Sequence, residues 1–169
     1  MSAAGSGDAG GQGGLTHLNA AGEARMVDVS AKEVTVRTAT AAGRVRLGAT
    51  CVAALRSGDV PKGDALAVAR IAGIMAAKKT PELVPLCHPL MISGVDVTAE
   101  VTDEGVELRA TVTTNERTGV EMEALTAVGV AGLAVVDMVK ALDRDAMITD
   151  IRVVAKSGGR SGDYRRAGE

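Results

Sequence analysis

The sequence has almost no aromatic side chains: one tyrosine, no phenylalanine and no tryptophan among 169 residues. Proteins that bind single-stranded nucleic acid commonly stack aromatic rings on the bases, and this chain has almost none to use. It also lacks a basic excess, since 19 Lys and Arg residues face 21 Asp and Glu residues. The sequence therefore argues against a nucleic-acid partner. A few local cations remain sufficient to hold a small anionic substrate.

Cysteine is scarce as well. Cys51 and Cys87 do not form a Cys-x-x-Cys pair, which argues against a zinc or iron–sulfur site, and we expect both thiols to stay reduced. The N-terminus has no basic start followed by an apolar leader, and no apolar run reaches the roughly 18 residues of a membrane span. These absences predict a cytoplasmic protein with no membrane partner and no metal site.

The apolar content consists mainly of 29 alanines and 22 valines. Small side chains bury little area each, so the core must be closely packed, and further burial between subunits is expected. Residues 1–14 are rich in glycine and predict a flexible tail. We expect a single domain over residues 15–156 and a Gly/Ser/Arg-rich segment over 157–169. The basic stretch over residues 156–162 either binds phosphate or is a frayed tail.

Apolar periodicity predicts the secondary structure. Strands are expected over residues 34–38, 91–101, 106–115 and 147–155, with a second strand or an extended turn over 45–47. Helices are expected over residues 50–55, 64–79 and 120–142, the second of them ended by Pro81. The segments 91–101 and 106–115 alternate apolar and polar residues, which indicates a hairpin with one buried face. This order predicts an α+β fold, an antiparallel sheet with helices packed on one face.

The third helix is unusually apolar. Between residues 124 and 136, Thr126 is the only non-apolar side chain apart from two glycines, so we expect the helix to be buried on all sides. Gly129 and Gly132 would let another backbone come close, either within the subunit or from a second one. Glu123 and Asp137 lie near the two ends of this helix, about 21 Å apart along its axis. They cannot both contact one small molecule from one straight helix, so if both serve one ligand, the site takes residues from two subunits.

Several segments hold polar residues that a core does not need, and each has a structural alternative. Lys62 beside Gly63 either meets an anion at a helix start or is a solvated lysine at a turn. Two prolines flank Leu86, Cys87 and His88. This segment is either a rigid loop that contacts a ligand or a structural loop. Further candidates are an arm over residues 16–30, the carboxylates Glu121 and Glu123, the pair Asp137 and Lys140, and the segment 156–162. Glu121 and Glu123 are either site carboxylates or residues of a first helical turn that the helix dipole favours. Asp137 and Lys140 are either a partly buried functional pair or a routine surface ion pair.

The sequence resembles one family over nearly the whole chain from Leu15 to about Asp163. The residues that carry the resemblance are LTHLN at 15–19, GEARMVDVS at 22–30, KGD at 62–64, ARIAGI at 69–74, PLCHPL at 85–90, TGVEMEALT at 118–126, Asp137-Met138 with Lys140, and AKSGG at 155–159. They are similar to the cyclic pyranopterin monophosphate synthases, the molybdenum-cofactor biosynthesis protein C family. PLCHPL and TGVEMEALT together are highly specific.

The resemblance implies a ferredoxin-like fold and a homohexamer, a trimer of dimers with active sites at a dimer interface. It implies conversion of 3′,8-cyclo-7,8-dihydroguanosine 5′-triphosphate into cyclic pyranopterin monophosphate with release of diphosphate, a lyase reaction. The implied catalytic residues are Asp137, Lys62 and Lys140, and the implied substrate-binding residues are Leu86, Cys87, His88, Glu121, Met122, Glu123 and Lys156. No tightly bound cofactor is implied, and the sequence leaves open whether Mg²⁺ accompanies the triphosphate.

The chemistry of that reaction suits these residues. Cations must offset about four negative charges on the triphosphate. Forming a cyclic phosphate also needs a base near the attacking oxygen and positive charge on the departing diphosphate. Asp137 as base or proton relay, Lys140 beside it and Lys62 as acid form a consistent assignment. The alternative is an oligomer that senses a nucleotide without catalysis, which would need the cations but not the acid–base groups.

Overall fold

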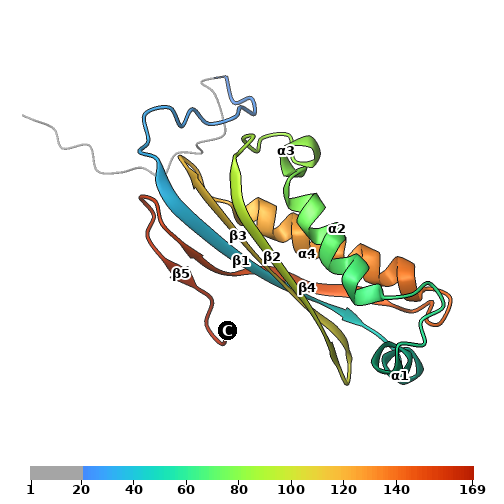
Figure 1. The fold of residues 1–169 in the computed structure, drawn as a ribbon. Helices are drawn as coiled ribbons and strands as arrows, with labels where there is room; N and C mark the ends of the chain where they lie inside the picture. Colours follow the sequence, from blue (N-terminus) through green and yellow to red (C-terminus); the bar gives the residue numbers. More distant parts are fainter. Residues whose placement is uncertain (1–20) are drawn as a thin grey trace, which may run out of the picture.

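The computed structural model describes residues 21–169, so the predicted tail and His17 lie outside the described part. One sheet has the strand order β2-β3-β1-β4-β5, with every neighbouring pair antiparallel. Helices α2 and α4 cover one face of this sheet, and α1 lies beyond one end of β1 (Figure 1). The elements are β1 (Thr35–Arg46), α1 (Ala49–Ser57), α2 (Ala65–Ala77), α3 (Thr80–Leu83), β2 (Ile92–Thr102), β3 (Gly105–Glu116), α4 (Glu121–Val139), β4 (Met147–Ser157) and β5 (Tyr164–Arg165). The predicted ferredoxin-like α+β class is confirmed.

The β2–β3 hairpin forms as predicted, but the expected interruption of the first strand is wrong. β1 runs unbroken from Thr35 to Arg46. Gly43 lies within it because the strand passes closely under α4: a Cβ atom at Gly43 would lie 2.7 Å from Cγ1 of Val128. The glycine serves close packing between strand and helix rather than a turn.

The structure also corrects the role expected for Pro81. Asp64 is the N-cap of α2, and its side chain accepts a hydrogen bond from the backbone N–H of Ala67 at 2.9 Å. α2 ends at Ala77, close to the predicted end. Pro81 does not stop this helix, because it lies in the first turn of the short helix α3. A proline needs no intrahelical acceptor at that position, so it can begin a helix as well as end one.

Helix α4 packs on β1, β3, β4 and α2, and the small side chains of these elements form the core. The prediction that α4 is buried on all sides is wrong, because Leu133 is 59% exposed and Met122 is 39% exposed. Among the described residues, α4 is the one helix with the length and hydropathy to cross a membrane, yet half of it is buried within the protein. Its apolar composition is explained by the core on one side and an apolar exposed face on the other.

The C-terminal segment is not a frayed tail. β5 pairs with the end of β4, and the backbone N–H of Arg166 donates to the carbonyl oxygen of Val154 at 2.8 Å. Glu169 forms an ion pair with Arg152. The single tyrosine, Tyr164, lies in β5 and is 41% exposed.

Candidate active site

The first group of predicted residues meets at the C-terminal end of α4. Lys62 donates hydrogen bonds from Nζ to the carboxylate and to the backbone carbonyl of Asp137, each at 2.9 Å. Lys140 donates from Nζ to the other carboxylate oxygen of Asp137 at 2.7 Å. We call Lys62, Asp137 and Lys140 the lysine–aspartate cluster. All three side chains are solvent-exposed, so the cluster is open to an incoming ligand.

The local structure explains how these three residues meet. Asp137 is in the last turn of α4 and Lys140 is its C-cap, so the two side chains lie three residues apart on one helix face. Lys62 lies in the loop between α1 and α2, two residues before the N-cap Asp64. The close packing of α2 against α4 brings that loop to the end of α4.

The two lysines set the charge state of Asp137. Its hydrogen bonds to Lys140 and Lys62, together with the attraction of their charges, lower its pKa to about 2. Asp137 is therefore ionised throughout the neutral range. A carboxylate with so low a pKa is a weak proton acceptor near neutral pH, although it can hold two ammonium groups in place.

The second group lies at the other end of α4. Lys156, on β4, donates from Nζ to Oε1 of Glu121 in the first turn of α4 at 2.9 Å. Glu123 follows within the same turn and is only 3% exposed. Cys87 lies near enough to Glu123 for the carboxylate to influence the thiol. We call Cys87, Glu121, Glu123 and Lys156, together with His88, which follows Cys87 in the chain, the glutamate–histidine cluster.

Burial dominates the electrostatics of this second cluster. It raises the pKa of Glu123 above its usual value, and the neighbouring charge of Glu121 raises the pKa further. Burial, followed by the charge of Glu123, also raises the pKa of the Cys87 thiol. Cys87 is therefore protonated at neutral pH and does not have the properties of a nucleophile. Glu123 is the carboxyl group of the two clusters that is best placed to exchange a proton nearer neutral pH.

His88 connects the loop between α3 and β2 with the segment before β1. Its Nε2 atom lies 2.7 Å from the backbone carbonyl oxygen of Val27, so this nitrogen carries the proton and donates it. The sequence singled out both segments but gave no sign of this contact. Leu86 is on the exposed surface of the same loop, and Met122 is on the exposed face of α4.

The structure brings the predicted residues into two clusters rather than one. Glu123 and Asp137 lie 14 residues apart on an unbroken helix, which separates them by about 21 Å along its axis. The pairing of β4 with β1 also separates the two ends of the sheet. Lys156 pairs with Ala39 near the start of β1, whereas Met147, soon after the end of α4, pairs with Arg46 at the end of β1. Within one subunit, the predicted site residues are therefore divided between two separate places.

A cationic cleft lies at the same end of the sheet as Lys156. Its volume is about 870 Å³, and Lys32, Arg37 and Arg160 are among the residues that line it. Arg37 also donates from Nε to the carbonyl oxygen of Glu116 at 2.9 Å, which fixes its position. The sequence indicates that the segment containing Arg160 could hold phosphate. It gives no such indication for Lys32 and Arg37, which resemble ordinary polar residues at the start of a strand.

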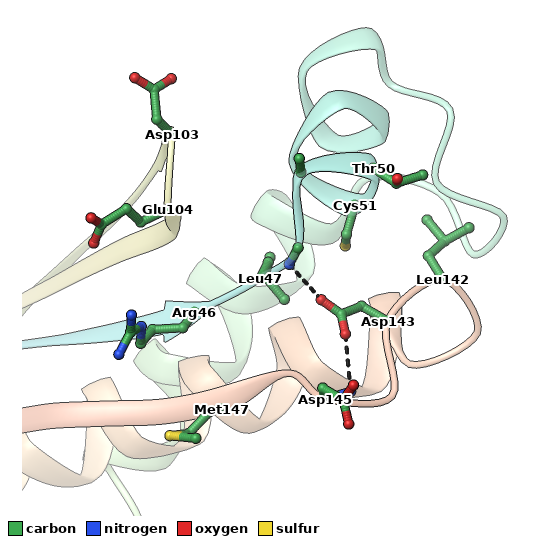
Figure 2. A pocket seen from close by; sticks show the side chains of 12 residues that line it. Arg46, Leu47, Thr50, Cys51, Asp103, Glu104, Leu142, Asp143, Asp145 and Met147 are labelled. Carbon is green, nitrogen blue, oxygen red and sulfur yellow. Dashed lines mark hydrogen bonds between the residues drawn. The ribbon is translucent and has the colours of Figure 1, made fainter.

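A different cleft, of about 630 Å³, lies beside α1 at the opposite end of β1 (Figure 2). Four carboxylates, Asp103, Glu104, Asp143 and Asp145, line it, and Asp143 accepts hydrogen bonds from the backbone N–H groups of Gly48 and Asp145. These charges would repel a polyphosphate. Within residues 21–169, no group of three or more His, Cys, Asp and Glu side chains is placed to hold a metal ion.

Comparison with known proteins gives consistent matches. Residues 26–159 match the MoaC family. The chain is 65% identical over 152 residues to the cyclic pyranopterin monophosphate synthase of Streptomyces griseus, covering 90% of this chain and 86% of that protein. It is 66% identical over 155 residues to the synthase of a Nocardioides species, covering 90% and 95%. It is 57% identical over 152 residues to that of a Roseiflexus species, covering 89% and 96%.

Proposed function

This chain belongs to the MoaC family, and from that premise we propose how its two clusters carry out the reaction for which its relatives are named, the synthesis of cyclic pyranopterin monophosphate. It is a lyase of molybdenum cofactor biosynthesis that acts on a small molecule derived from GTP. The observation that carries the proposal is the family match over residues 26–159, which contains every residue of both clusters. We take the substrate to be 3′,8-cyclo-7,8-dihydroguanosine 5′-triphosphate, and the products to be cyclic pyranopterin monophosphate and diphosphate.

Phosphate recognition requires several cations in one place. The substrate carries about four negative charges, and each charge-assisted contact is stronger than a neutral hydrogen bond. Lys62 and Lys140 supply two cations at one end of α4, and Lys32, Arg37 and Arg160 supply three at the other. In a site shared between two subunits, these two sources meet at one triphosphate, where they bind it and stabilise diphosphate as it leaves.

Ring closure at the α-phosphorus requires a group that takes a proton from the attacking hydroxyl. Asp137 has too low a pKa to be the first acceptor while both lysines are bound to it. We therefore assign Asp137 to hold Lys62 and Lys140 and to pass the proton of the attacking hydroxyl on to the surrounding water, to which the cluster is open, and Lys62 to donate a proton to the departing diphosphate. Glu123, whose pKa is raised by burial, is assigned to exchange protons with the pterin as its rings are rebuilt.

We infer that the working protein is a homohexamer, a trimer of dimers, in the cytoplasm, and that each site uses residues of two subunits. The separation of about 21 Å between Glu123 and Asp137 supports a shared site, because one small substrate cannot span it. We also propose that no tightly bound cofactor takes part, since the cations required by the triphosphate are side chains of the chain itself.

The direct test is to incubate the purified protein with the cyclised triphosphate and to measure diphosphate and cyclic pyranopterin monophosphate. We expect both products in equal amounts, and their loss in Lys62→Ala. Val68→Ala, a change on the exposed face of α2, is the matched control. A protein that binds the substrate in calorimetry but releases no diphosphate would be a nucleotide sensor rather than a synthase. Loss of activity on treatment with a chelator would show that a metal ion is needed.

A further inference from the structure

We propose that Gly119 is a positioning residue of the active site. Its lack of a side chain lets the carboxylate of Glu121 fold back over the main chain just before α4, and that carboxylate holds the ammonium group of Lys156 in place for the phosphates of the substrate. The inference rests on the proposed function, because it gives the contact between Glu121 and Lys156 a role in binding the triphosphate. Gly119 does not touch the substrate itself and acts through Glu121.

The first observation is the space beside Gly119, which lies two residues before Glu121. A Cβ atom at position 119 would overlap Oε2 of Glu121 and would lie 2.8 Å from its Cδ and 3.0 Å from its Oε1. Apart from the adjoining residues, these three atoms are the nearest to that point. The carboxyl group of Glu121 therefore occupies the space that an alanine side chain would fill, and alanine would displace it by more than about 1 Å.

The second observation is that the backbone does not need a glycine at this position. The φ angle of Gly119 lies outside the left-handed region, in contrast to those of Gly158 and Gly159. Gly119 is not a helix cap either, since the N-cap of α4 is Val120. The obstacle to alanine is the end of a flexible side chain, so the fold can accept alanine here, but the carboxylate of Glu121 cannot keep its place.

The third observation is the contact that Glu121 makes. Nζ of Lys156 donates to Oε1 of Glu121 at 2.9 Å, and the two side chains are 30% and 25% exposed. Among residues 21–169, the ammonium group of Lys156 has no other hydrogen-bond partner. A lysine side chain loses much rotamer freedom when it is held in one place. Because Glu121 holds Lys156 before the substrate arrives, this loss does not weaken substrate binding.

The fourth observation is the place of Lys156 in the chain. It lies near the end of β4, which leads directly into Gly159 and Arg160 at the cationic cleft. Held by Glu121, its ammonium group adds a cation to the same end of the sheet, and the charge of the Glu121 carboxylate is neutralised. If the two groups are separated, the cation is no longer fixed and an unpaired carboxylate repels the phosphates.

The first test is Gly119→Ala, which changes no charge. The KM for the cyclised triphosphate should rise about tenfold, which corresponds to the loss of one charge-assisted contact. The value of kcat should change by less than about threefold, because the lysine–aspartate cluster is intact and uniform binding alone is lost. The melting temperature should not fall, since alanine restricts the unfolded chain more than glycine does.

The matched control is Gly94→Ala on β2. A Cβ atom at Gly94 meets no atom within 4 Å, and its φ angle also lies outside the left-handed region. We expect this variant to keep KM and kcat within about twofold of the wild type. A wild-type KM in Gly119→Ala would overturn the proposal. Failure of Gly119→Ala to fold would overturn it as well, because the glycine would then serve the backbone.

The second test is a double-mutant cycle with Glu121→Ala, which removes the carboxylate that Gly119 accommodates. Whatever Glu121→Ala does alone, adding Gly119→Ala to it should change KM by less than about twofold, because no carboxylate remains to be displaced. A structural role for Gly119 would instead give the same effect in both backgrounds. A further rise of about tenfold in the double variant would therefore overturn the proposal.

These outcomes are separable from failure of the proposed function. If the wild type bound the triphosphate in calorimetry but released no diphosphate, the assigned reaction would be wrong. An affinity about tenfold weaker in Gly119→Ala would still support the positioning role. If the wild type were active and Gly119→Ala bound the triphosphate equally tightly, the reaction would stand and the positioning role would be wrong.

Discussion

Asp137 lies between the ammonium groups of Lys62 and Lys140, which would otherwise repel each other. Its pKa of about 2 keeps it ionised at neutral and mildly acidic pH. An acidic limb in the pH profile of turnover would therefore come from another group. Because Asp137 carries a negative charge, replacing it with the neutral amide of asparagine should change its interactions with the lysines more than it changes the fold.

We expect Asp137→Asn to abolish turnover while retaining the fold. Asparagine keeps the size of the side chain but cannot hold two ammonium groups as an anion or accept a proton near neutral pH. Binding of the triphosphate should persist or tighten, because a negative charge beside it is removed. Calorimetric affinity and single-turnover rate on the same preparation measure the two effects. Near wild-type turnover would reduce the Asp137–Lys140 contact to a surface ion pair of little value.

Glu123 should make stability depend on pH. Burial raises the pKa of its carboxyl group above the ordinary value of 4.5, so ionisation costs the folded state more than the unfolded state. Glu123→Gln removes that cost. The melting temperature of the variant should match the wild type below pH 4.5 and exceed it by a growing margin as the pH rises through the folded pKa.

Thermal melts from pH 4 to pH 8 measure this margin. Glu100→Gln, which removes an exposed carboxylate on β2, is the matched control and should show no such gain. A difference between Glu123→Gln and the wild type that stays constant across this range would mean that Glu123 is not buried as a titrating carboxyl group.

At the scale of elements, helices α2 and α4 depend on close contact at Gly73. A Cβ atom there would lie 3.0 Å from the backbone carbonyl of Ala127 and 3.3 Å from both methyl groups of Val97. Gly73→Ala should gain up to about 1 kcal/mol in helix propensity and lose about 1–3 kcal/mol to overpacking. We expect a net loss in the free energy of unfolding by urea. Val68→Ala, on the exposed face of the same helix, is the control and should change the free energy of unfolding by less than about 0.5 kcal/mol. A Gly73→Ala protein more stable than the wild type would mean that α4 can move away from α2.

Most elements could be predicted because their apolar residues repeat with a clear period. The β2–β3 hairpin and α4 are examples, and their ends agree with the prediction to within a few residues. The predicted break at Gly43 and the predicted helix end at Pro81 were wrong because each residue type has two roles. Glycine permits a turn or a close contact, and proline can end a helix or begin one. No local pattern distinguishes these uses without the neighbouring element.

The candidate site was predictable as a set of residues but not as an arrangement. Lys62 and Asp137 are 75 residues apart, and only the packing of α2 against α4 brings them together. The contact of His88 with Val27 and the cationic cleft at Lys32 and Arg37 depend on tertiary structure in the same way. In contrast, the separation of Glu123 from Asp137 follows from helix geometry alone, and the continuous α4 confirms it.

At the scale of the whole molecule, the division into two clusters predicts complementation between inactive variants. Asp137→Ala and Glu123→Ala should each be inactive alone. In a mixed dimer with shared sites, one of the two sites contains both defects and the other contains neither. After random exchange of equal amounts, about one quarter of all sites should be intact, and turnover should recover to about that fraction.

The control for this mixture is a pair of variants within one cluster. Asp137→Ala mixed with Lys62→Ala should recover nothing, because every site receives its lysine–aspartate cluster from a single subunit. Recovery with this pair, or none with the first pair after mixing is verified by mass, would show that the sites are not divided in this way.

The position of the single tyrosine gives the protein an internal optical reporter. With no tryptophan in the chain, ultraviolet emission comes from Tyr164 alone, and this residue lies on β5 rather than in the core. Its fluorescence reports whether the C-terminal strand is attached to β4, whereas far-ultraviolet circular dichroism reports the sheet and helices together. If β5, with its two residues, detaches before the rest of the fold, the two signals will change at different temperatures. In that case, emission measures the attachment of one short strand, and circular dichroism is the measure of global unfolding.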